Sequence, residues 1–299
     1  VYLHNGLWAS LMSGTPGAAQ YWSWDVVEQH NLYPLLRAGS RFVAATGLGD
    51  AENWTRTAAT VETPGRSDLR FAPGAGFGAA AQTDFTVDKT GPPAGMEKFP
   101  SFLQGDFHRA LFPRPLTFHI NNDQAGSFIL RLSQVAKAGA HVRMGLDGQF
   151  TEKDFPPAAG DYAPPPGQGD VQVDLPAGPH TITIENTGKD WVVIRDLIFT
   201  HYTAALAAIG LVGRQSAVFW VYHRANVDAP LGKETDAAAG KLLVTGLPPG
   251  HYRVTWWDTR AGEPLKTDKV YAGKGSEGAA LDTPVILRDA AVYLVKIPG

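Results

Sequence analysis

The sequence of 299 residues contains no cysteine, few charged residues and no long hydrophobic run. The absence of cysteine excludes disulfides, thiol catalysis and zinc sites with cysteine ligands, but it does not fix the compartment. Charged residues make up 18% of the chain, below the roughly 25% of typical soluble domains. The formal net charge of −3 offers no basic surface for a phosphate backbone, so no nucleic-acid partner is expected.

No stretch of the sequence approaches the roughly 18 apolar residues that cross a bilayer. The most apolar windows, 217–222 and 290–297, have the length of buried strands, so we expect no membrane partner. Apolar residues still reach 44% of the chain, enough to form hydrophobic cores, and the length of 299 residues suggests two or three domains. The sequence opens at Val1 without a methionine or a leader pattern, which we interpret as a processing site, an artificial boundary or a gene fragment.

Residues 1–48 differ in pattern from the rest of the chain. Apolar residues recur near the start at three- and four-residue spacing, at Leu3, Leu7, Trp8, Leu11 and Met12. This spacing predicts one apolar helical face. The run of small and aromatic residues Ala18–Trp24 predicts a short buried strand, and 31–43 is predicted to be helical with Pro34 in its first turn. The order helix, strand, helix is typical of an α/β fold, but three elements form neither a doubly wound sheet nor a barrel, so further elements are expected upstream.

From about Gly49 the sequence changes to short alternating segments separated by turn residues, which predicts a β-sandwich. The predicted strands are 128–132, 142–146, 171–175, 181–185, 191–194 and 197–202. Asp147-Gly148 follows the second of these strands and predicts a tight turn. The Pro/Gly-rich stretch 156–169 predicts a surface loop.

A third pattern begins near Ala204 and has the size of a small immunoglobulin-like sandwich. Its predicted strands are 217–222, 241–245, 252–257, 285–287 and 291–297. The adjacent residues Trp256 and Trp257 face opposite sides of one strand, so one is expected to be buried and the other partly exposed. We favour a domain interface over sugar binding for the exposed one, since interfaces are rich in tryptophan.

Several motifs stand close together near the start of the chain. They are His4-Asn5-Gly6-Leu7-Trp8-Ala9-Ser10, the Ser13-Gly14 turn, Gln20-Tyr21-Trp22-Ser23-Trp24-Asp25 and Asn31-Leu32-Tyr33. Together they resemble the end of the barrel of glycoside hydrolases in the cellulase-like clan typified by family 5. On this resemblance 18–24 is the last barrel strand, 32–43 is the last helix, and residues 1–48 are a short α/β remnant of a TIM barrel.

The resemblance implies sugar contacts at the C-terminal end of that strand. A tryptophan there forms the floor of the subsite beside the cleaved bond, where its indole stacks on a sugar. Trp22 and Trp24 are the matching positions, and Trp24 is preferred because it lies nearer the strand end. Both instead pack against a neighbouring domain in the alternative interpretation. Asn5 is interpreted equally as a substrate contact or as a helix cap.

The same resemblance implies that the catalytic groups are not in this chain. Retaining members use two glutamates roughly 5 Å apart on earlier strands, one as acid/base and one as nucleophile. Both are expected upstream of Val1, and the carboxylates of this segment, Asp25 and Glu28, match neither position. We assign no catalytic residue and expect the chain alone to be inactive.

The middle region carries a second set of motifs. They are Gly126–Leu132, Val142–Gly148, Leu175-Pro-Ala-Gly178-Pro-His180-Thr-Ile182 and Glu185-Asn186-Thr-Gly188-Lys-Asp190-Trp191. Together they resemble the galactose-binding-like jelly rolls appended to glycosidases, which implies such a domain over 49–203. Asp190 and Trp191 are candidates to line a glycan groove, although a tryptophan in this context is more often part of a core. A structural calcium is a further implication, without an Asp-rich loop that identifies its ligands.

The tail has its own resemblance. Ala217-Val-Phe-Trp220, Pro248-Pro-Gly250-His-Tyr252 and Trp256-Trp257-Asp258-Thr259 are similar to the small sandwich that closes such multidomain glycosidases, here 204–299.

The sequence as a whole therefore predicts a mainly β chain with two β-sandwich domains, a galactose-binding-like jelly roll and a small immunoglobulin-like sandwich, after a barrel remnant. The predicted function is the C-terminal portion of a secreted, extracellular, bacterial-type polysaccharide-degrading enzyme that needs no cofactor. Its expected partners are the upstream barrel and a polysaccharide or oligosaccharide of β-glucan, mannan or xylan type. A stand-alone carbohydrate-binding module and a structural spacer without ligand remain as alternatives.

Overall fold

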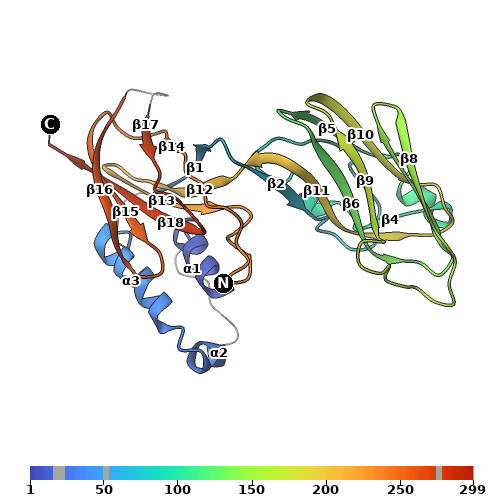
Figure 1. The fold of residues 1–299 in the computed structure, drawn as a ribbon, viewed down its shortest axis with the longest axis horizontal. Coiled ribbons are helices and arrows are strands. Elements are labelled where there is room, and N and C mark those ends of the chain that lie inside the picture. Colours follow the sequence, from blue (N-terminus) through green and yellow to red (C-terminus); the bar gives the residue numbers. More distant parts are fainter. Residues whose placement is uncertain (16–23, 50–53, 274–277, 299) are drawn as a thin grey trace. The chain divides into compact units, whose positions relative to one another are not determined.

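The computed structural model describes residues 1–15, 24–49, 54–273 and 278–298, and it divides the chain into two compact units (Figure 1). Unit 1 consists of Val1–Gly65 and Ala204–Gly299, and unit 2 consists of Arg66–Thr203. Within the described residues no helix is long and apolar enough to cross a membrane. Both units are built mainly from antiparallel strands, which confirms the prediction of a mainly β chain.

Unit 1 begins with the helices α1 (Tyr2–Leu11), α2 (Trp24–Gln29) and α3 (Tyr33–Thr46). The apolar face predicted for α1 is confirmed, because Leu3, Leu7 and Trp8 are buried along it. Pro34 lies in the first turn of α3, as predicted, and Gly47 ends this helix in a left-handed conformation with φ of 64°.

The strand predicted over 18–24 is not found at Trp24, the one residue of this range that the structure describes. Trp24 is the first residue of α2, and 18–23 lie outside the described residues. The described part of 1–48 is therefore helical and contains no strand.

The strands of unit 1 follow one path through a strongly bent sheet. They are β1 (Thr55–Glu62), β12 (Leu206–Val212), β13 (Ser216–His223), β14 (Lys241–Val244), β15 (Gly250–Asp258), β16 (Glu263–Ala272), β17 (Ala279–Asp282) and β18 (Asp289–Ile297). The order is β16-β15-β18-β13-β12-β1-β14-β17. Because the first part of β1 pairs with β12 and its last three residues pair with β14, this strand crosses from one layer of the sandwich to the other.

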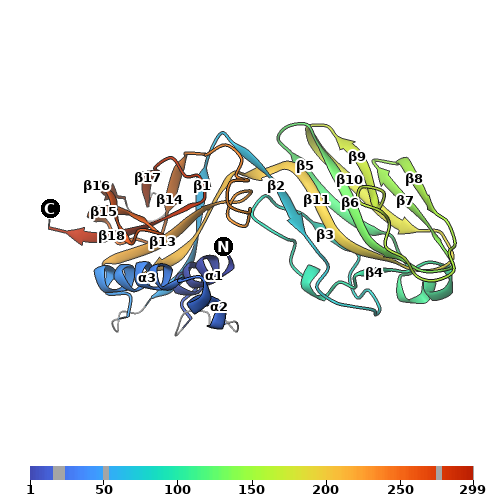
Figure 2. The same cartoon turned by 60° about the horizontal axis from the view of Figure 1, so that its bottom comes forward.

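The central sheet of unit 1 is covered on both faces. Alternate residues of β13, such as Phe219, point into the core between the two strand layers. The residues between them, such as Trp220, lie in a second core beneath α1 and α3, which Figure 2 shows along one face of the sheet. Trp256 lies in the first core and Trp257 in the second, and both are buried. The expectation of one partly exposed indole is wrong because the helices cover that face.

Unit 2 is a sandwich of two sheets. One contains β3 (Asp84–Thr86), β5 (Leu116–Asn122), β10 (Gly178–Asn186), β7 (Ala140–Leu146) and β8 (Gln149–Phe155), in that order. The other contains β2 (Arg66–Phe71), β11 (Val192–Ala204), β6 (Gly126–Val135) and β9 (Asp170–Leu175), with β4 (Phe102–Leu103) paired to β11. Two short 3₁₀ helices, η1 (Met96–Lys98) and η2 (Asp106–Leu111), lie in the connections.

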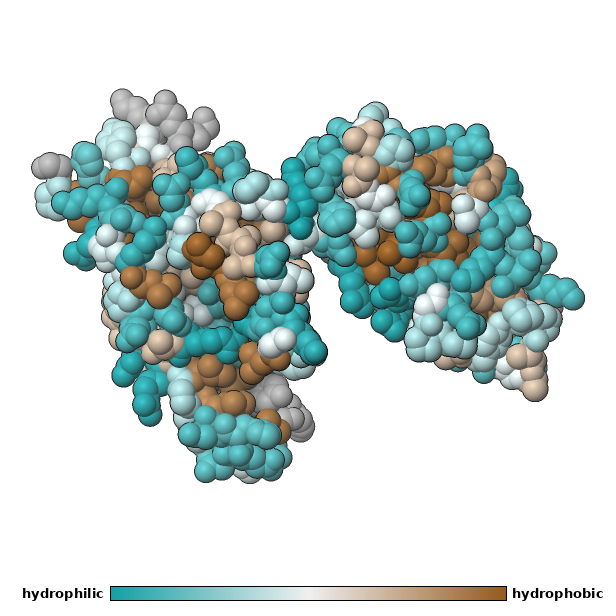
Figure 3. Space-filling view, viewed as in Figure 1, coloured by the Kyte–Doolittle hydropathy of each residue, from teal (hydrophilic) through white to brown (hydrophobic). Residues whose placement is uncertain are grey.

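The hairpin turn predicted at Asp147-Gly148 is confirmed. Both residues have positive φ, 49° and 87°, as a type I′ turn between β7 and β8 requires. Aromatic side chains fill the core between the two sheets, with the rings of Phe128 and Phe199 4.7 Å apart. On the face of unit 2 seen in Figure 3, hydrophobic residues are bordered by hydrophilic ones.

Candidate functional site

The last of the four motifs behind the jelly-roll resemblance, 185–191, contains the loop between β10 and β11. At its centre the buried amide of Asn186 donates to the backbone carbonyls of Leu103, at 3.1 Å, and Asp190. The amide oxygen accepts from the backbone N–H groups of Gly188, at 3.0 Å, and His141, at 3.3 Å. Because the buried Asn186 amide is paired at both its donors and its acceptor, it favours one conformation of the loop. Any other conformation would leave a buried polar group without a hydrogen-bond partner.

The glycine of this loop allows two backbones to touch. The carbonyl of Gly188 accepts from the backbone N–H of Asp106, at 2.9 Å, which joins the loop to η2. A Cβ at Gly188 would lie 2.2 Å from the backbone nitrogen of His141, and a Cβ at Gly105 would lie 2.4 Å from the Gly188 carbonyl oxygen. Only glycine fits either position without a shift of the backbone.

The loop ends at Trp191, whose indole is the first of four aromatic rings that contact one another in succession. The Trp191 indole lies edge-on to Phe102 with centroids 5.0 Å apart, and Phe102 lies edge-on to Phe77 at 5.4 Å. Phe77 in turn contacts the ring of His108 at 5.6 Å. Trp191 and Phe102 are half-buried, Phe77 is 54% exposed and His108 is exposed. We call these four residues the aromatic surface.

The two residues predicted to line a groove have different roles in this arrangement. The Asp190 carboxylate accepts the backbone N–H of Trp191 at 2.9 Å, so it shapes the loop that presents the indole. Trp191 itself is half-buried, so part of its indole remains at the surface. Sequence reasoning missed Phe77 and Phe102, because an isolated aromatic residue in a loop or a two-residue strand has no periodic signal.

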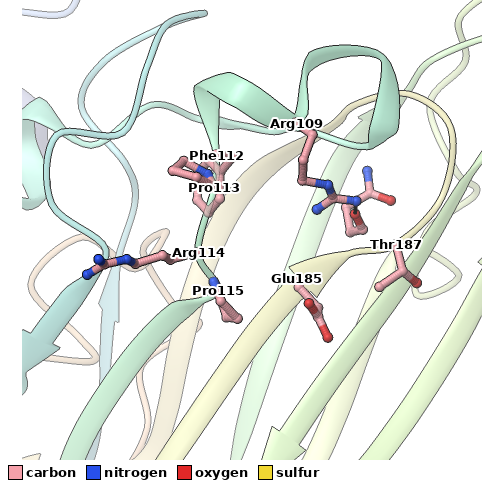
Figure 4. Close-up of a pocket in the computed structure, with 8 residues that line it drawn as sticks. Arg109, Phe112, Pro113, Arg114, Pro115, Glu185 and Thr187 are labelled. Carbon is pink, nitrogen blue, oxygen red and sulfur yellow. Dashed lines mark hydrogen bonds between the residues drawn. The ribbon is translucent and has the colours of Figure 1, made fainter.

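A small hollow lies on the other side of the same loop (Figure 4). It has a volume of about 180 Å³ and is lined by Arg109, Phe112, Pro113, Arg114, Pro115, Glu185, Asn186 and Thr187. The Arg109 guanidinium is held by the Asp106 carboxylate at 2.9 Å and the Asn186 carbonyl at 2.7 Å. Figure 4 shows the Arg114 side chain extending away from Arg109. The two cations do not converge, and the volume is below the roughly 300 Å³ of small-molecule sites, so this hollow is not the candidate site.

The other predicted site residues lie in unit 1 or outside the described residues. Trp22 is among the latter. Trp24, at the start of α2, is 76% exposed. Asn5 lies inside α1, whose N-cap is Val1, so the helix-cap alternative is wrong. Its amide instead donates to the carbonyl of Val227 at 3.0 Å and to the Asp228 carboxylate at 2.7 Å, which ties α1 to the following sandwich.

No side-chain cluster for a metal was found in the part of the chain that the structure describes. Within it, no group of three or more histidine, aspartate or glutamate side chains lies close enough together to hold an ion.

Comparisons with known proteins find only distant structural similarity. No protein-family model matches the chain, and no curated protein matches it. A solved structure of a cycloisomaltooligosaccharide glucanotransferase from Paenibacillus sp., complexed with cycloisomaltoheptaose, is 12% identical with a TM-score of 0.27. The match covers 75% of this chain and 45% of that one. The neighbour is a carbohydrate-active enzyme, but a TM-score this low carries no argument about fold or function.

Proposed function

We propose that the aromatic surface of unit 2 binds a polysaccharide or oligosaccharide. We further propose that the chain is the C-terminal portion of a secreted polysaccharide-degrading glycoside hydrolase. The observation that carries the binding proposal is the chain of partly exposed rings from Trp191 through Phe102 to Phe77, with centroids 5.0 and 5.4 Å apart. An isolated exposed aromatic needs no explanation, whereas a contiguous group of partly exposed rings is typical of a ligand surface.

The chemistry of the surface suits a sugar. Indole and phenyl rings offer flat apolar area against the C–H faces of a pyranose, and an indole N–H donates to a hydroxyl. Polar side chains stand beside two of the rings, since Asp106 lies on η2 with His108 and Lys189 lies on the loop before Trp191, and both are exposed. Hydrogen bonds to hydroxyls at the border of an apolar platform fix the orientation of a ligand.

In unit 1 the proposal includes one further exposed aromatic residue, Trp24. Trp24 is the residue that the resemblance to a barrel end assigns to a sugar subsite, together with Trp22 and Asn5, and it is exposed at the start of α2. The two catalytic glutamates remain assigned to an upstream barrel, with the β-sandwich units as accessory domains. The test of this part is hydrolysis of β-glucan, mannan and xylan by this chain alone, measured as reducing ends. We expect none, and release of reducing ends would overturn the assignment.

The binding proposal is tested by affinity gel electrophoresis of the full chain in soluble β-glucan, mannan and xylan. We expect retardation in at least one polysaccharide, and we expect the variants Trp191→Ala and Phe77→Ala to lose it. We expect Phe77→Ala to fold like the wild type, because this exposed ring lies in a loop, so a loss of retardation in this variant would report the loss of the ring itself. The matched control is Tyr271→Ala, which removes a ring of similar exposure from β16 of unit 1 and should leave retardation unchanged. No retardation in any polysaccharide would favour the structural spacer instead.

A further inference from the structure

A second hollow lies on unit 2, beside the sheet that contains β6, β9 and β11. It has a volume of about 420 Å³, within the roughly 300–1,000 Å³ of small-molecule sites. Its walls come from these three strands and from the proline-rich loop between β8 and β9. Two arginines, Arg131 and Arg195, line it together with Asp170. The hollow therefore combines cationic groups with the apolar wall of the three consecutive prolines at 164–166.

An ion pair on the outer face of the sheet forms one side of the hollow. Arg131 on β6 pairs in register with Asp170 on β9 and with Asp196 on β11. The neighbouring residues Leu130 and Leu197 point into the core, so the alternation of side chains places the three charged residues on the opposite, outer face. The Arg131 guanidinium donates to both oxygens of the Asp170 carboxylate, at 3.0 Å to Oδ1 and 2.8 Å to Oδ2. This two-point contact fixes the orientation of both side chains.

The second arginine of the hollow stands on a β-bulge. Between Ile194 and Asp196 the pairing advances by two residues in β11 and by one in β6, so Arg195 is the extra residue of the bulge. A bulge of this kind redirects a side chain. The Nε atom of Arg195 donates to Oδ2 of Asp196 at 3.0 Å, which places its guanidinium on the outer face of the sheet as well.

The carboxylate of Asp196 is shared between two arginines. It is buried and accepts from Nε and Nη2 of Arg70 on β2, at 2.8 and 2.9 Å, in addition to the bond from Arg195. The contact of Arg195 with this carboxylate uses Nε, and the Arg195 side chain is 55% exposed. The two terminal nitrogens of a guanidinium form a further edge, which can hold another carboxylate at two points.

The excess of cations at the hollow favours an anionic ligand. The guanidinium groups of three arginines share two carboxylates, in the cluster of Arg70, Arg131, Arg195, Asp170 and Asp196. The ammonium of Lys153 adds a further positive charge, because it donates to the backbone carbonyl of Asp170 at 2.8 Å. A carboxylate matches the terminal N–H groups of Arg195 in both shape and charge. The apolar proline wall suits the C–H groups of a sugar ring, so a uronic acid residue fits the lining.

The hollow and the aromatic surface lie along the same face of one sheet. Phe102 of the aromatic surface pairs in register with Val193 on β11, and its neighbour Leu103 points into the core, so Phe102 lies on the outer face. Trp191, which contacts Phe102, immediately precedes β11. Arg195 follows four residues later, at most about 14 Å away along a strand that rises about 3.2–3.4 Å per residue. An extended polysaccharide can therefore reach from the rings to Arg195.

We propose that the hollow beside Arg195 is a carboxylate subsite of the aromatic surface, so that the polysaccharide bound there is an acidic one. A uronic acid residue places its carboxylate against the terminal N–H groups of Arg195, while neighbouring sugar residues stack on Trp191 and Phe102. This inference rests on the proposed function, because it names the class of polysaccharide that the same face binds.

The test is isothermal titration calorimetry of the full chain with glucuronoxylan and with polygalacturonate, each compared with the same polysaccharide after reduction of its carboxyl groups to alcohols. We expect at least one acidic form to bind about tenfold or more tightly than its carboxyl-reduced form. Arg195→Gln should abolish this difference and leave the affinity for the carboxyl-reduced form unchanged, which also shows that the variant is folded. Arg114→Gln is the matched control, because it removes the same charge from an exposed residue of unit 2 outside the hollow.

The outcomes separate this subsite from the proposed function. A preference for the acidic form that is lost in Arg195→Gln and kept in Arg114→Gln supports the subsite. Equal affinity for the acidic and carboxyl-reduced forms, or a preference that persists in Arg195→Gln, overturns the subsite and leaves the proposed function intact. Binding of poly-glutamate as tight as that of the acidic polysaccharide overturns the assigned ligand, because an acidic peptide then suffices. The absence of binding to every acidic and neutral polysaccharide overturns both proposals.

Discussion

The Nε2 atom of His4 lies 2.9 Å from the Oδ2 atom of Asp289, and this contact joins the first helix of the chain to its last strand. Both side chains are buried. The Thr259 hydroxyl donates to the other oxygen of the same carboxylate. Burial alone would raise the pKa of Asp289, but the hydrogen bonds from His4 and Thr259 hold that pKa below its usual value.

Substitution of Asp289 by alanine is expected to destabilise unit 1. It leaves the His4 ring and the Thr259 hydroxyl buried without their partner, which costs about 3 kcal/mol or more. Because the folded-state pKa of Asp289 is lowered, its contribution is full above the unfolded pKa of about 3.9 and is lost as the pH falls through the folded value. The measurement is urea denaturation of wild type and Asp289→Ala between about pH 3 and pH 7.

The control for this prediction is Asp282→Ala on β17, where the carboxylate is exposed and lies 4.0 Å from Lys241. We expect this variant to change the free energy of unfolding by no more than about 0.5 kcal/mol at any pH. An Asp289→Ala curve that runs parallel to wild type down to about pH 3 would show that His4 and Asp289 do not interact as described.

Phe42 on α3 is expected to contribute strongly to the packing of α1 and α3 against the sheet of unit 1. Its ring is buried and lies edge-on to Trp8, at 5.1 Å, and to Trp257, at 5.8 Å. Phe42→Ala should lower the free energy of unfolding by about 3–5 kcal/mol, because it opens a cavity between α1, α3 and the sheet. Tyr33→Ala on the same helix removes a ring that is 46% exposed and should have little effect. Equal losses in the two variants would contradict the packing.

Much of the local structure follows from the sequence because it depends on neighbouring residues. The three- and four-residue spacing of Leu3, Leu7 and Trp8 predicts the buried face of α1 without knowledge of what covers it. Asp147-Gly148 predicts its turn because the two positive φ angles exclude most other pairs.

The parts that the sequence does not predict depend on distant residues. Trp257 is buried because helices some 200 positions earlier in the chain lie over it, and nothing in its own strand indicates this. The aromatic surface joins Phe77, Phe102 and Trp191 from three segments that no periodicity links. For the same reason the pairing of β1 with β12 and β14, which places it in unit 1, has no signal in the sequence of β1 itself.

Substitution of Gly188 by alanine tests the loop that presents Trp191. The added Cβ would lie 2.2 Å from the backbone nitrogen of His141. A backbone atom cannot move away by a change of side-chain rotamer, so the two segments would have to separate. We expect a loss of about 1–3 kcal/mol in the stability of unit 2, with faster hydrogen exchange over 186–191. Gly160→Ala is the matched control, because a Cβ there meets nothing within 4 Å. Wild-type exchange in Gly188→Ala would show that the two backbones do not pack closely.

Replacing the buried amides of Gln104 and Asn186 by apolar side chains is expected to change the free energy of unfolding in opposite directions. Neither amide atom of Gln104 has a hydrogen-bond partner among the described residues, whereas the amide of Asn186 is paired at both ends. An unpaired buried amide costs about 1–3 kcal/mol, and an apolar group of similar shape does not. Gln104→Met should therefore raise the free energy of unfolding, measured by urea denaturation, and Asn186→Leu should lower it. If Gln104→Met instead destabilises the chain as strongly as Asn186→Leu, the Gln104 amide makes hydrogen bonds in solution, and its surroundings at the end of β4 differ from those described.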